Sequence, residues 1–286
     1  MKRRLIVIAG PTAVGKTDYS IGLAQRYGSP IISADSRQIY KEMTIGTAVP
    51  DASQLAAVKH YFIHSHSVTE PYSSGQYEID ALGLIERLFS EGHETLVMSG
   101  GSGFYIDAVC NGLDDLPTPS AELRETLTRR VKEEGVNVLA KKLRQLDPKA
   151  FESIDTNNGQ RVVRALETVI LSGRSFTEFK MERPKKRDFD IEKICLTRPR
   201  DILYERIDQR VLRMIDEGLV NEVRGLMPYR DLPALRTVGY KEIFDYLDDR
   251  ISLDEAIRLI QRNTRHYAKK QLTWWKRDPD IKWMEL

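Results

Sequence analysis

Apolar runs and amphipathic segments alternate at the start of the chain. Residues 5–8 form a short apolar run that leads into a glycine-rich turn. Residues 16–27 have the pattern of a helix that Gly28 closes, and the next apolar run, PIISAD, ends at Asp35. We therefore predict a strand, a loop, a helix and a second strand, the unit from which parallel sheets are built.

Three later runs continue this pattern. TLVMS at residues 95–99 predicts a third strand and breaks into GGSGFY, KICLT from Lys193 predicts a fourth, and IKWM near the end predicts a last one. Ligands of parallel sheets collect at the carboxyl ends of the strands. We expect Asp35, the loop 100–103 and the glycine-rich turn after the first strand to meet there.

The middle of the chain has a different character. Between the linker LPTPS (residues 116–120) and the linker ERPKKRD (residues 182–188) the strand-like runs disappear and helical patterns replace them. We predict a helical insertion at residues 116–189 within a core formed by residues 1–115 and 190–286.

The carboxyl-terminal part is also predicted to be helical. One helix covers residues 201–217, and a longer one starts at a capping box of Ser252 and Glu255 and runs towards Trp275. The spacing of the apolar positions in the longer helix predicts four residues that face the core. They are Leu253, Ile257, Ile260 and Tyr267.

Composition narrows the class of protein. The chain has 286 residues, a formal net charge of +2 and two distant cysteines without a Cys-x-x-Cys motif, so we expect a globular protein of a reducing cytoplasm. No apolar run approaches the roughly 20 residues that span a bilayer. Net charge alone argues for no partner, but residues 258–277 carry seven Lys and Arg residues and no carboxylate. That asymmetry permits contact with a polyanion.

The turn after the first strand has the chemistry of a phosphate site. Gly10, Gly15, Lys16 and Thr17 match G-x-x-x-x-G-K-[ST] between a strand and a helix. Backbone N–H groups and the helix amino terminus face an anion in this motif, Lys16 adds charge, and the Thr17 hydroxyl binds Mg²⁺. We call residues 10–17 the phosphate loop and predict an α/β fold of the P-loop NTPase type, with a parallel sheet flanked by helices.

The phosphate loop does not specify what the phosphates carry. ATP, GTP and a prenyl diphosphate all satisfy it. The chain has no [NT]-K-x-D segment for guanine and no apolar strand that ends in Asp-Glu, which disfavours a GTPase and an ATPase motor.

Asp35 is the candidate base. Its carboxylate can take a proton from a group that attacks a phosphate-bearing substrate, or it can bind Mg²⁺ through water. The alternative is a structural aspartate that caps the following turn. On the helix from residue 201, Arg206, Arg210 and Arg213 recur at helical spacing, and one or more of them can neutralise a leaving phosphate.

Three histidines and two tryptophans remain. Residues His60, His64 and His66 cluster near a short strand without ligands at metal spacing, so we expect them to be structural. Trp274 and Trp275 can stack on bases, but packing is expected for at least one of them.

Six segments together resemble a known family. GPTAVGKT, SADSRQIYKEMTIGTAVP, GGSGFYI, GQRVVRALE, RTVGYKE and TRHYAKKQLTW have the order and spacing of the bacterial tRNA dimethylallyltransferases, also called tRNA isopentenyltransferases. The resemblance runs from the first strand to the last helix. Two departures stand out, GGSGFY for the usual GGTGLY and HYF for HHL.

The resemblance implies a reaction and its partners. A dimethylallyl group would pass from dimethylallyl diphosphate to N6 of the adenine beside the anticodon, at position 37 of tRNA, with Mg²⁺ as cofactor. Asp35 would be the base and Arg210 would stabilise the departing diphosphate. The residues implied to bind diphosphate are Gly10, Pro11, Thr12, Ala13, Val14, Gly15, Lys16 and Thr17. Those implied to contact the anticodon stem-loop are Asp35, Ser36, Arg37, Gln38, Ser102, Arg124, Gln160, Arg161, Val162, Val163, Arg164, Arg236, Thr237, Val238, Gly239, Tyr240 and Lys241.

Two other functions stay open from the residues alone. A small-molecule kinase of the P-loop type would use Asp35 as base for a hydroxyl and ATP in the loop. A non-enzymatic RNA-binding protein would have no need of Lys16, Thr17 and Asp35 together. We expect a monomer.

Overall fold

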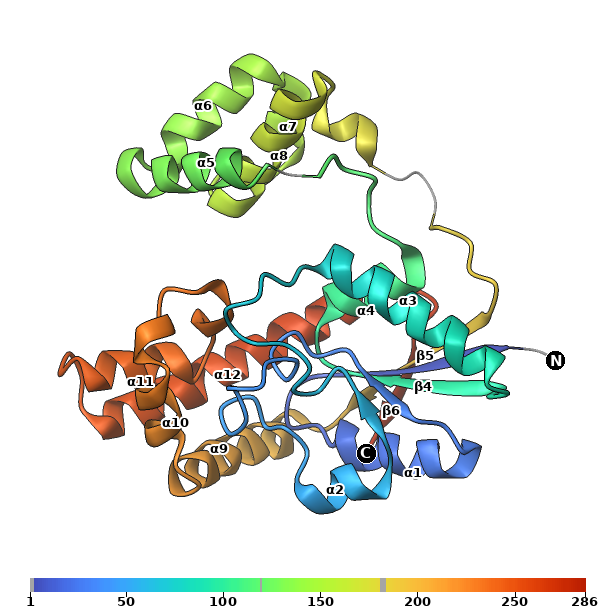
Figure 1. Cartoon of the computed structure of the whole chain (residues 1–286). Coiled ribbons are helices and arrows are strands. Elements are labelled where there is room, and N and C mark those ends of the chain that lie inside the picture. The colour runs from blue at the N-terminus through green and yellow to red at the C-terminus, as the bar shows by residue number, and fades with distance from the viewer. Residues whose placement is uncertain (1–2, 119, 181–183) are drawn as a thin grey trace. The chain divides into compact units, whose positions relative to one another are not determined.

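The computed structural model describes residues 3–118, 120–180 and 184–286 (Figure 1). The chain divides into a core unit, Met1–Asn111 with Lys186–Leu286, and an insertion unit, Gly112–Lys185. The predicted insertion, residues 116–189, overlaps the second of these units. Three residues of the predicted linkers lie outside the described residues, namely Pro119, Glu182 and Arg183.

The core unit is built on one parallel sheet. Within the described residues six strands pair in the order β3-β2-β4-β1-β5-β6, and every neighbouring pair is parallel. They are β1 (Arg4–Ala9), β2 (Ile31–Ser33), β3 (His60–Tyr61), β4 (Thr95–Ser99), β5 (Asp190–Thr197) and β6 (Lys282–Glu285). The α/β fold and the five strands predicted from apolar runs are confirmed.

Helices pack on both faces of the sheet. In β1, Leu5 and Val7 face one core with α3 (Ser74–Ser90) and α4 (Gly103–Asn111). Ile6 and Ile8 face another core with α1 (Lys16–Tyr27) and α9 (Arg200–Asp216). A strand buried on both faces reads as a continuous apolar run, which is why residues 5–8 were recognisable.

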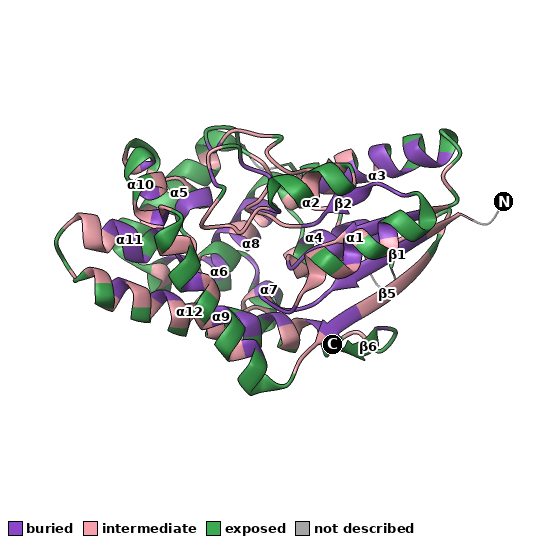
Figure 2. Cartoon of the chain, turned by 90° about the horizontal axis from the view of Figure 1, so that it is seen from below, coloured by how far each residue is buried: buried purple, intermediate pink, exposed green. Residues whose placement is uncertain are grey.

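A third group of elements lies beside the sheet. These are α2 (Ala52–Ala57), α10 (Leu219–Gly225), α11 (Tyr240–Leu247), α12 (Leu253–Trp275) and the short 3₁₀ turns Met227–Tyr229 and Pro233–Leu235. Helices α9 to α12 contact one another in sequence order and enclose a third apolar core with Met43, Tyr240 and Ile260. Figure 2 shows exposed and buried residues on opposite sides of α9 and α12.

The insertion unit has its own apolar core. It consists of α5 (Ala121–Glu134), α6 (Val136–Leu146), α7 (Pro148–Ser153), α8 (Gly159–Ser172) and the 3₁₀ turn Phe176–Phe179. Buried leucines of α5, α6 and α8 fill the centre. No helix of the described segments is long and apolar enough to cross a bilayer.

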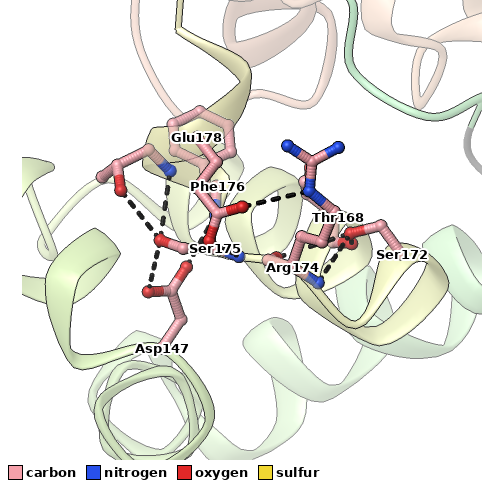
Figure 3. Close-up of polar contacts among 8 residues, drawn as sticks. Asp147, Thr168, Ser172, Arg174, Ser175, Phe176 and Glu178 are labelled. Carbon is pink, nitrogen blue, oxygen red and sulfur yellow. Dashed lines mark hydrogen bonds and ion pairs between the residues drawn. The ribbon is translucent and has the colours of Figure 1, made fainter.

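A buried carboxylate fastens the end of the insertion to its middle (Figure 3). Asp147 is only 3% exposed and caps α7 through the N–H of Ala150 at 3.0 Å. It also accepts hydrogen bonds from the Ser175 hydroxyl at 2.8 Å and the Phe176 N–H at 2.7 Å. The side chain therefore holds the 3₁₀ turn against α7, a long-range role that its position in the sequence does not reveal.

Candidate active site

A cavity of about 420 Å³ opens at the carboxyl edge of the sheet. Its lining comes from the turns after β1, β2 and β4, from residues 45–51 and 237–239, and from one side of α9 and of α12. Parallel strands all end at this edge, so the turns that follow them converge. Every lining residue belongs to the core unit.

The phosphate loop is fixed from outside by two arginines. Arg206 of α9 donates through Nε to the carbonyl of Ala13 at 2.8 Å, and Arg198, just after β5, donates through Nε to the carbonyl of Val14 at 2.8 Å. Ala13 has a left-handed backbone with φ 64°, a strained conformation for a residue with a Cβ. Contacts from two distant segments hold that conformation in place.

Two more cations lie at the mouth of the loop. The Lys16 ammonium donates to the carbonyls of Gly10 at 3.0 Å and Pro11 at 2.8 Å. Arg210 reaches the Thr12 hydroxyl through a guanidinium nitrogen at 3.4 Å. Both cations therefore bind weak neutral acceptors, which a phosphate oxygen can replace with stronger, charge-assisted hydrogen bonds.

The positive charges around the phosphate loop lie close together and lack carboxylate partners within the described residues. Burial and the Arg210 guanidinium lower the pKa of Lys16 to about 8, against a smaller opposing effect of Asp35. Burial also lowers the pKa of Arg210, and Arg213 and Arg206 add to that effect. None of the four cations makes an ion pair with a carboxylate of the described residues. Neighbouring positive charges without partners favour binding of a polyanion.

We expect inorganic diphosphate to bind with proton uptake near pH 8. At that pH about half of the Lys16 side chains are neutral in the free protein, and a bound anion returns them to the charged form. Calorimetric titrations in buffers of different ionisation heats should show an uptake of about half a proton per site at pH 8, falling away towards pH 6. Affinity should weaken above pH 8 as the ammonium is lost.

Lys16→Ala is the control for this measurement, because it leaves only the ionisation of diphosphate itself. An identical proton uptake by wild type and Lys16→Ala would show that Lys16 does not titrate on binding.

Asp35 caps the turn after β2 and also lines the cavity. Its Oδ1 accepts the N–H groups of Arg37 at 2.9 Å and Gln38 at 3.2 Å, so the side chain does cap the turn after β2. Its Oδ2 has no hydrogen bond to a described residue, and Asp35 lines the cavity. One oxygen therefore orients the carboxylate, and the other makes no hydrogen bond within the described part of the chain.

Gln271 of α12 ties the phosphate loop to the turn after β4. Its Oε1 accepts the N–H of Thr12 at 2.9 Å, and its Nε2 donates to the carbonyl of Gly101 at 2.8 Å. A Cβ on Gly101 would lie 2.4 Å from that Nε2, so a larger residue there would displace the glutamine amide. The side chain is buried, and one residue thus sets the spacing of two cavity walls.

Short hydrogen bonds also join the turn after β2 to its neighbours. The Ser102 hydroxyl accepts the N–H of Ser36 at 2.9 Å and lies 3.1 Å from the Ser36 hydroxyl. The Gln38 amide donates to the carbonyls of Thr47 at 3.1 Å and Ala48 at 2.9 Å. These hydrogen bonds fix the turn that carries Asp35 to the turn after β4 and to residues 47–48.

Oxygen ligands for Mg²⁺ are present but few. The Thr17 hydroxyl has no hydrogen bond within the described part of the chain, and Asp18 and Asp35 line the same cavity. No group of three or more His, Cys, Asp or Glu among the described residues is placed to hold a metal. Mg²⁺ commonly uses one or two protein oxygens together with waters and substrate phosphates, so this donor set fits the ion.

Comparison with known proteins identifies the family. A family model described as IPP transferase matches residues 38–278. The chain belongs to the IPP transferase family. It is 49% identical to the tRNA dimethylallyltransferase 2 of Porphyromonas gingivalis over 98% of this chain and 93% of that protein.

Two solved structures of the family are similar to this fold. The tRNA isopentenylpyrophosphate transferase of Bacillus halodurans is 38% identical, with a TM-score of 0.73 over 99% of this chain and 90% of that one. A eukaryotic dimethylallyltransferase, determined in snapshots of its action on tRNA, is 26% identical, with a TM-score of 0.85 over 99% of this chain and 74% of that one.

The segment RTVGYKE serves the cavity in more than one way. Thr237, Val238 and Gly239 line it, whereas Arg236 and Lys241 are exposed beside it. The remaining residue of the predicted tRNA-contact run, Tyr240, has no exposed surface, so its side chain supports the fold from within. In this family member the run is both a wall of the cavity and part of the third apolar core.

The predicted tRNA-contact residues of the insertion differ in their exposure and in their existing ion pairs. Gln160 and Arg161 are exposed, but Val162 and Val163 are buried in the core of the insertion. Arg124 and Arg164 share the buried carboxylate of Glu167. Arg124 donates two hydrogen bonds of 2.7 Å to this carboxylate, and Arg164 donates one of 3.5 Å.

Tyr267 was wrongly predicted to face the core. It exposes 43% of its surface and lines the cavity, because the side of α12 that carries Ile260, Thr264 and Gln271 borders the cavity. Of the two tryptophans, Trp275 is buried and Trp274 donates to Asp107 at 3.0 Å.

The histidines make local contacts. His60 Nδ1 lies 2.8 Å from the carbonyl of Val58, and burial lowers the pKa of His60. His64 lies 3.2 Å from the Thr44 hydroxyl, and His66 packs on Tyr72.

Three side chains that support the cavity were not predicted, and Arg206 was predicted only as a candidate to neutralise a leaving phosphate. Arg198 and Arg206 hold the phosphate loop, Gln271 joins two walls, and Glu222, considered below, holds residues 44–46. Of these only Gln271 stands in a segment that the resemblance singles out, AKKQLTW. The others contact the cavity from more than 170 residues away, which no local pattern shows.

Proposed function

We propose that this protein transfers a dimethylallyl group from dimethylallyl diphosphate to N6 of the adenine at position 37 of tRNA. The observation that carries the proposal is one cavity with three kinds of wall. Its lining combines a phosphate loop whose cations make no ion pair within the described residues, a carboxylate with one oxygen outside any hydrogen bond of those residues, and a set of apolar side chains. The names of the relatives support the same reaction.

The chemistry needs each of these walls. The adenine amine is a poor nucleophile because its lone pair is delocalised into the ring. As its nitrogen bonds to C1 of the prenyl chain, the bond from C1 to the bridging oxygen breaks and its electron pair leaves with diphosphate. The amine then gives its proton to Asp35, so that diphosphate and N6-dimethylallyladenine are the products.

Charge builds on the diphosphate as it departs. Lys16 and Arg210 are already in place at the phosphate loop, and fixed cations stabilise developing charge without reorganisation. When bound by Thr17 and nearby oxygens, Mg²⁺ would neutralise part of the same charge.

The adenine must leave its stack to reach Asp35. Sequence-specific proteins usually bind RNA at loops whose bases can be splayed out, and extrusion of a base into a pocket is the general solution for chemistry on it. The anticodon loop provides such a base. We assign the exposed residues Gln160 and Arg161 of the insertion to the backbone of the tRNA.

We expect tRNA binding to weaken steeply with salt and Arg161→Gln to flatten that dependence. Arg161 is exposed and its side chain has no partner among the described residues, so it is free to bind a phosphate. Each lost phosphate contact removes about one unit from the slope of log K against log salt. Fluorescence titrations of an anticodon stem-loop at several salt concentrations measure it.

Arg129→Gln is the matched control, since Arg129 is an exposed arginine of the same unit already paired with Glu133 at 3.1 Å. Binding that is insensitive to salt, or equal slopes for both variants and wild type, would remove Arg161 from the tRNA interface.

One labelling experiment tests the function as a whole. Purified protein is incubated with dimethylallyl diphosphate labelled in the prenyl group, with and without unmodified tRNA. Label should pass to tRNA, and only when adenine is present at position 37.

Parallel incubations with γ-labelled ATP separate the alternatives. Label that moves from ATP to a small hydroxyl compound would identify a kinase instead. Retention of tRNA without any transfer would identify a non-enzymatic RNA-binding protein.

A further inference from the structure

The cavity has an apolar wall that the phosphate chemistry does not explain. We use this name for Ile45, Val211, Met214, Val238 and Ile260, which line the cavity and pack into the third apolar core. On α9, Val211 and Met214 follow Arg210 within about one helical turn. An apolar group attached to a diphosphate at the loop therefore meets this wall next.

A single carboxylate holds one side of the wall in place. Glu222 of α10 accepts the N–H groups of Thr44 at 3.0 Å and Ile45 at 2.7 Å through Oε2. Through Oε1 it accepts the N–H of Gly46 at 3.0 Å and the hydroxyl of Tyr240 at 2.6 Å. Three successive backbone donors thus converge on one anion, and hydrogen bonds to charged groups are the stronger kind.

The same carboxylate reaches the segment that carries Val238 through Tyr240. The ring is fully buried and lies over Gly46, where an added Cβ would come within 2.6 Å of it. Val238 stands two residues before Tyr240 in the chain. Glu222 therefore connects the loop that carries Ile45 to the segment that carries Val238.

We propose that Glu222 is a positioning residue that closes the apolar wall around a five-carbon prenyl group and so excludes longer prenyl chains. The inference rests on the proposed function and adds a determinant of substrate length to it. The loop of residues 44–46 has no strand or helix of its own, and Glu222 supplies acceptors for its three N–H groups. Without the carboxylate the loop loosens and the wall opens.

Glu222→Gln tests the proposal at constant size. The amide has one acceptor oxygen and turns an NH₂ group towards backbone donors. The N–H groups of residues 44–46 therefore lose part of their acceptors. The measurement is the ratio of kcat/KM for geranyl diphosphate to that for dimethylallyl diphosphate, with the same tRNA. Discrimination in apolar pockets is worth about 10- to 200-fold per methylene, so we expect the ratio to rise on the order of tenfold or more.

Glu205→Gln is the matched control, because it removes the same charge from an exposed position of α9 that lines no part of the cavity. A general loss of folding would lower both rates and leave their ratio unchanged. A folded Glu222→Gln protein with the wild-type ratio would overturn the proposal.

Met214→Ala opens the wall without touching the carboxylate, in case Glu222→Gln does not fold. It should raise the same ratio, whereas Leu212→Ala, an exposed position of the same helix, should not. A wild-type ratio in Met214→Ala would overturn the wall as the limit on chain length. Wild-type protein that transfers no dimethylallyl group at all would instead refute the proposed function, and this inference with it.

Discussion

The Asp35→Asn variant is expected to transfer the prenyl group about 10²- to 10⁴-fold more slowly than wild type, the range for loss of a general base. Asparagine keeps the oxygen that accepts the N–H groups of Arg37 and Gln38, so the turn after β2 keeps its cap. It cannot accept the proton of the adenine amine. Single-turnover rates at saturating substrates measure the chemical step alone.

Asp35→Ala separates capping from catalysis. It removes both oxygens, so it should be about as slow as Asp35→Asn and should in addition lower the melting temperature. Both variants should still bind diphosphate and tRNA. If Asp35 acted by organising Mg²⁺, excess metal would restore part of the rate and diphosphate binding would suffer too. Near-normal single-turnover transfer by Asp35→Asn would refute the base assignment.

The parts of the site that follow a strand could be predicted from the sequence. The apolar run 5–8, the motif of residues 10–17 and the position of Asp35 after the second run are local signals, and the parallel sheet brings them to one edge. Lys16 and Arg210 do both lie at the loop. Tertiary packing adds little here beyond what the motif already requires.

The supports of the site could not be predicted. Gln271 contacts Thr12 and Gly101 only because α12 runs past both turns, and Glu222 contacts residues 44–46 only because α10 packs beside them. A glutamine or glutamate on a helix has no feature that distinguishes such a role from a solvated one. The sequence therefore indicates the reacting groups better than the groups that position them.

The long helix shows the same limit on a smaller scale. Its predicted start is right, since Ser252 caps it through the N–H of Glu255 at 3.2 Å. The other half of the predicted capping box is absent, because the Glu255 carboxylate instead pairs with Arg258 at 2.6 Å. Tyr267 fits the apolar period of the helix but borders the cavity, which periodicity cannot distinguish from a core.

Arg210→Ala is expected to lower kcat by about 10²- to 10³-fold, as removal of one fixed donor to developing charge does. Lys16→Ala should lose a similar factor, and Thr17→Ala should lose activity that excess Mg²⁺ partly restores. None of the three residues is among those implied to contact tRNA, so tRNA affinity should stay within a few-fold of wild type. Filter binding of tRNA and steady-state kinetics measure the two effects separately.

The two cations should not act independently. Arg210 helps to lower the pKa of Lys16, so Arg210→Ala should raise that pKa above about 8 and reduce the proton uptake that accompanies diphosphate binding at pH 8. Both cations also serve one diphosphate, so the double variant should lose less than the product of the single losses. A strictly multiplicative loss, with unchanged proton uptake in Arg210→Ala, would mean that the two side chains do not share a site. A fall in tRNA affinity equal to the fall in rate would mean that the loop binds RNA and not the leaving group.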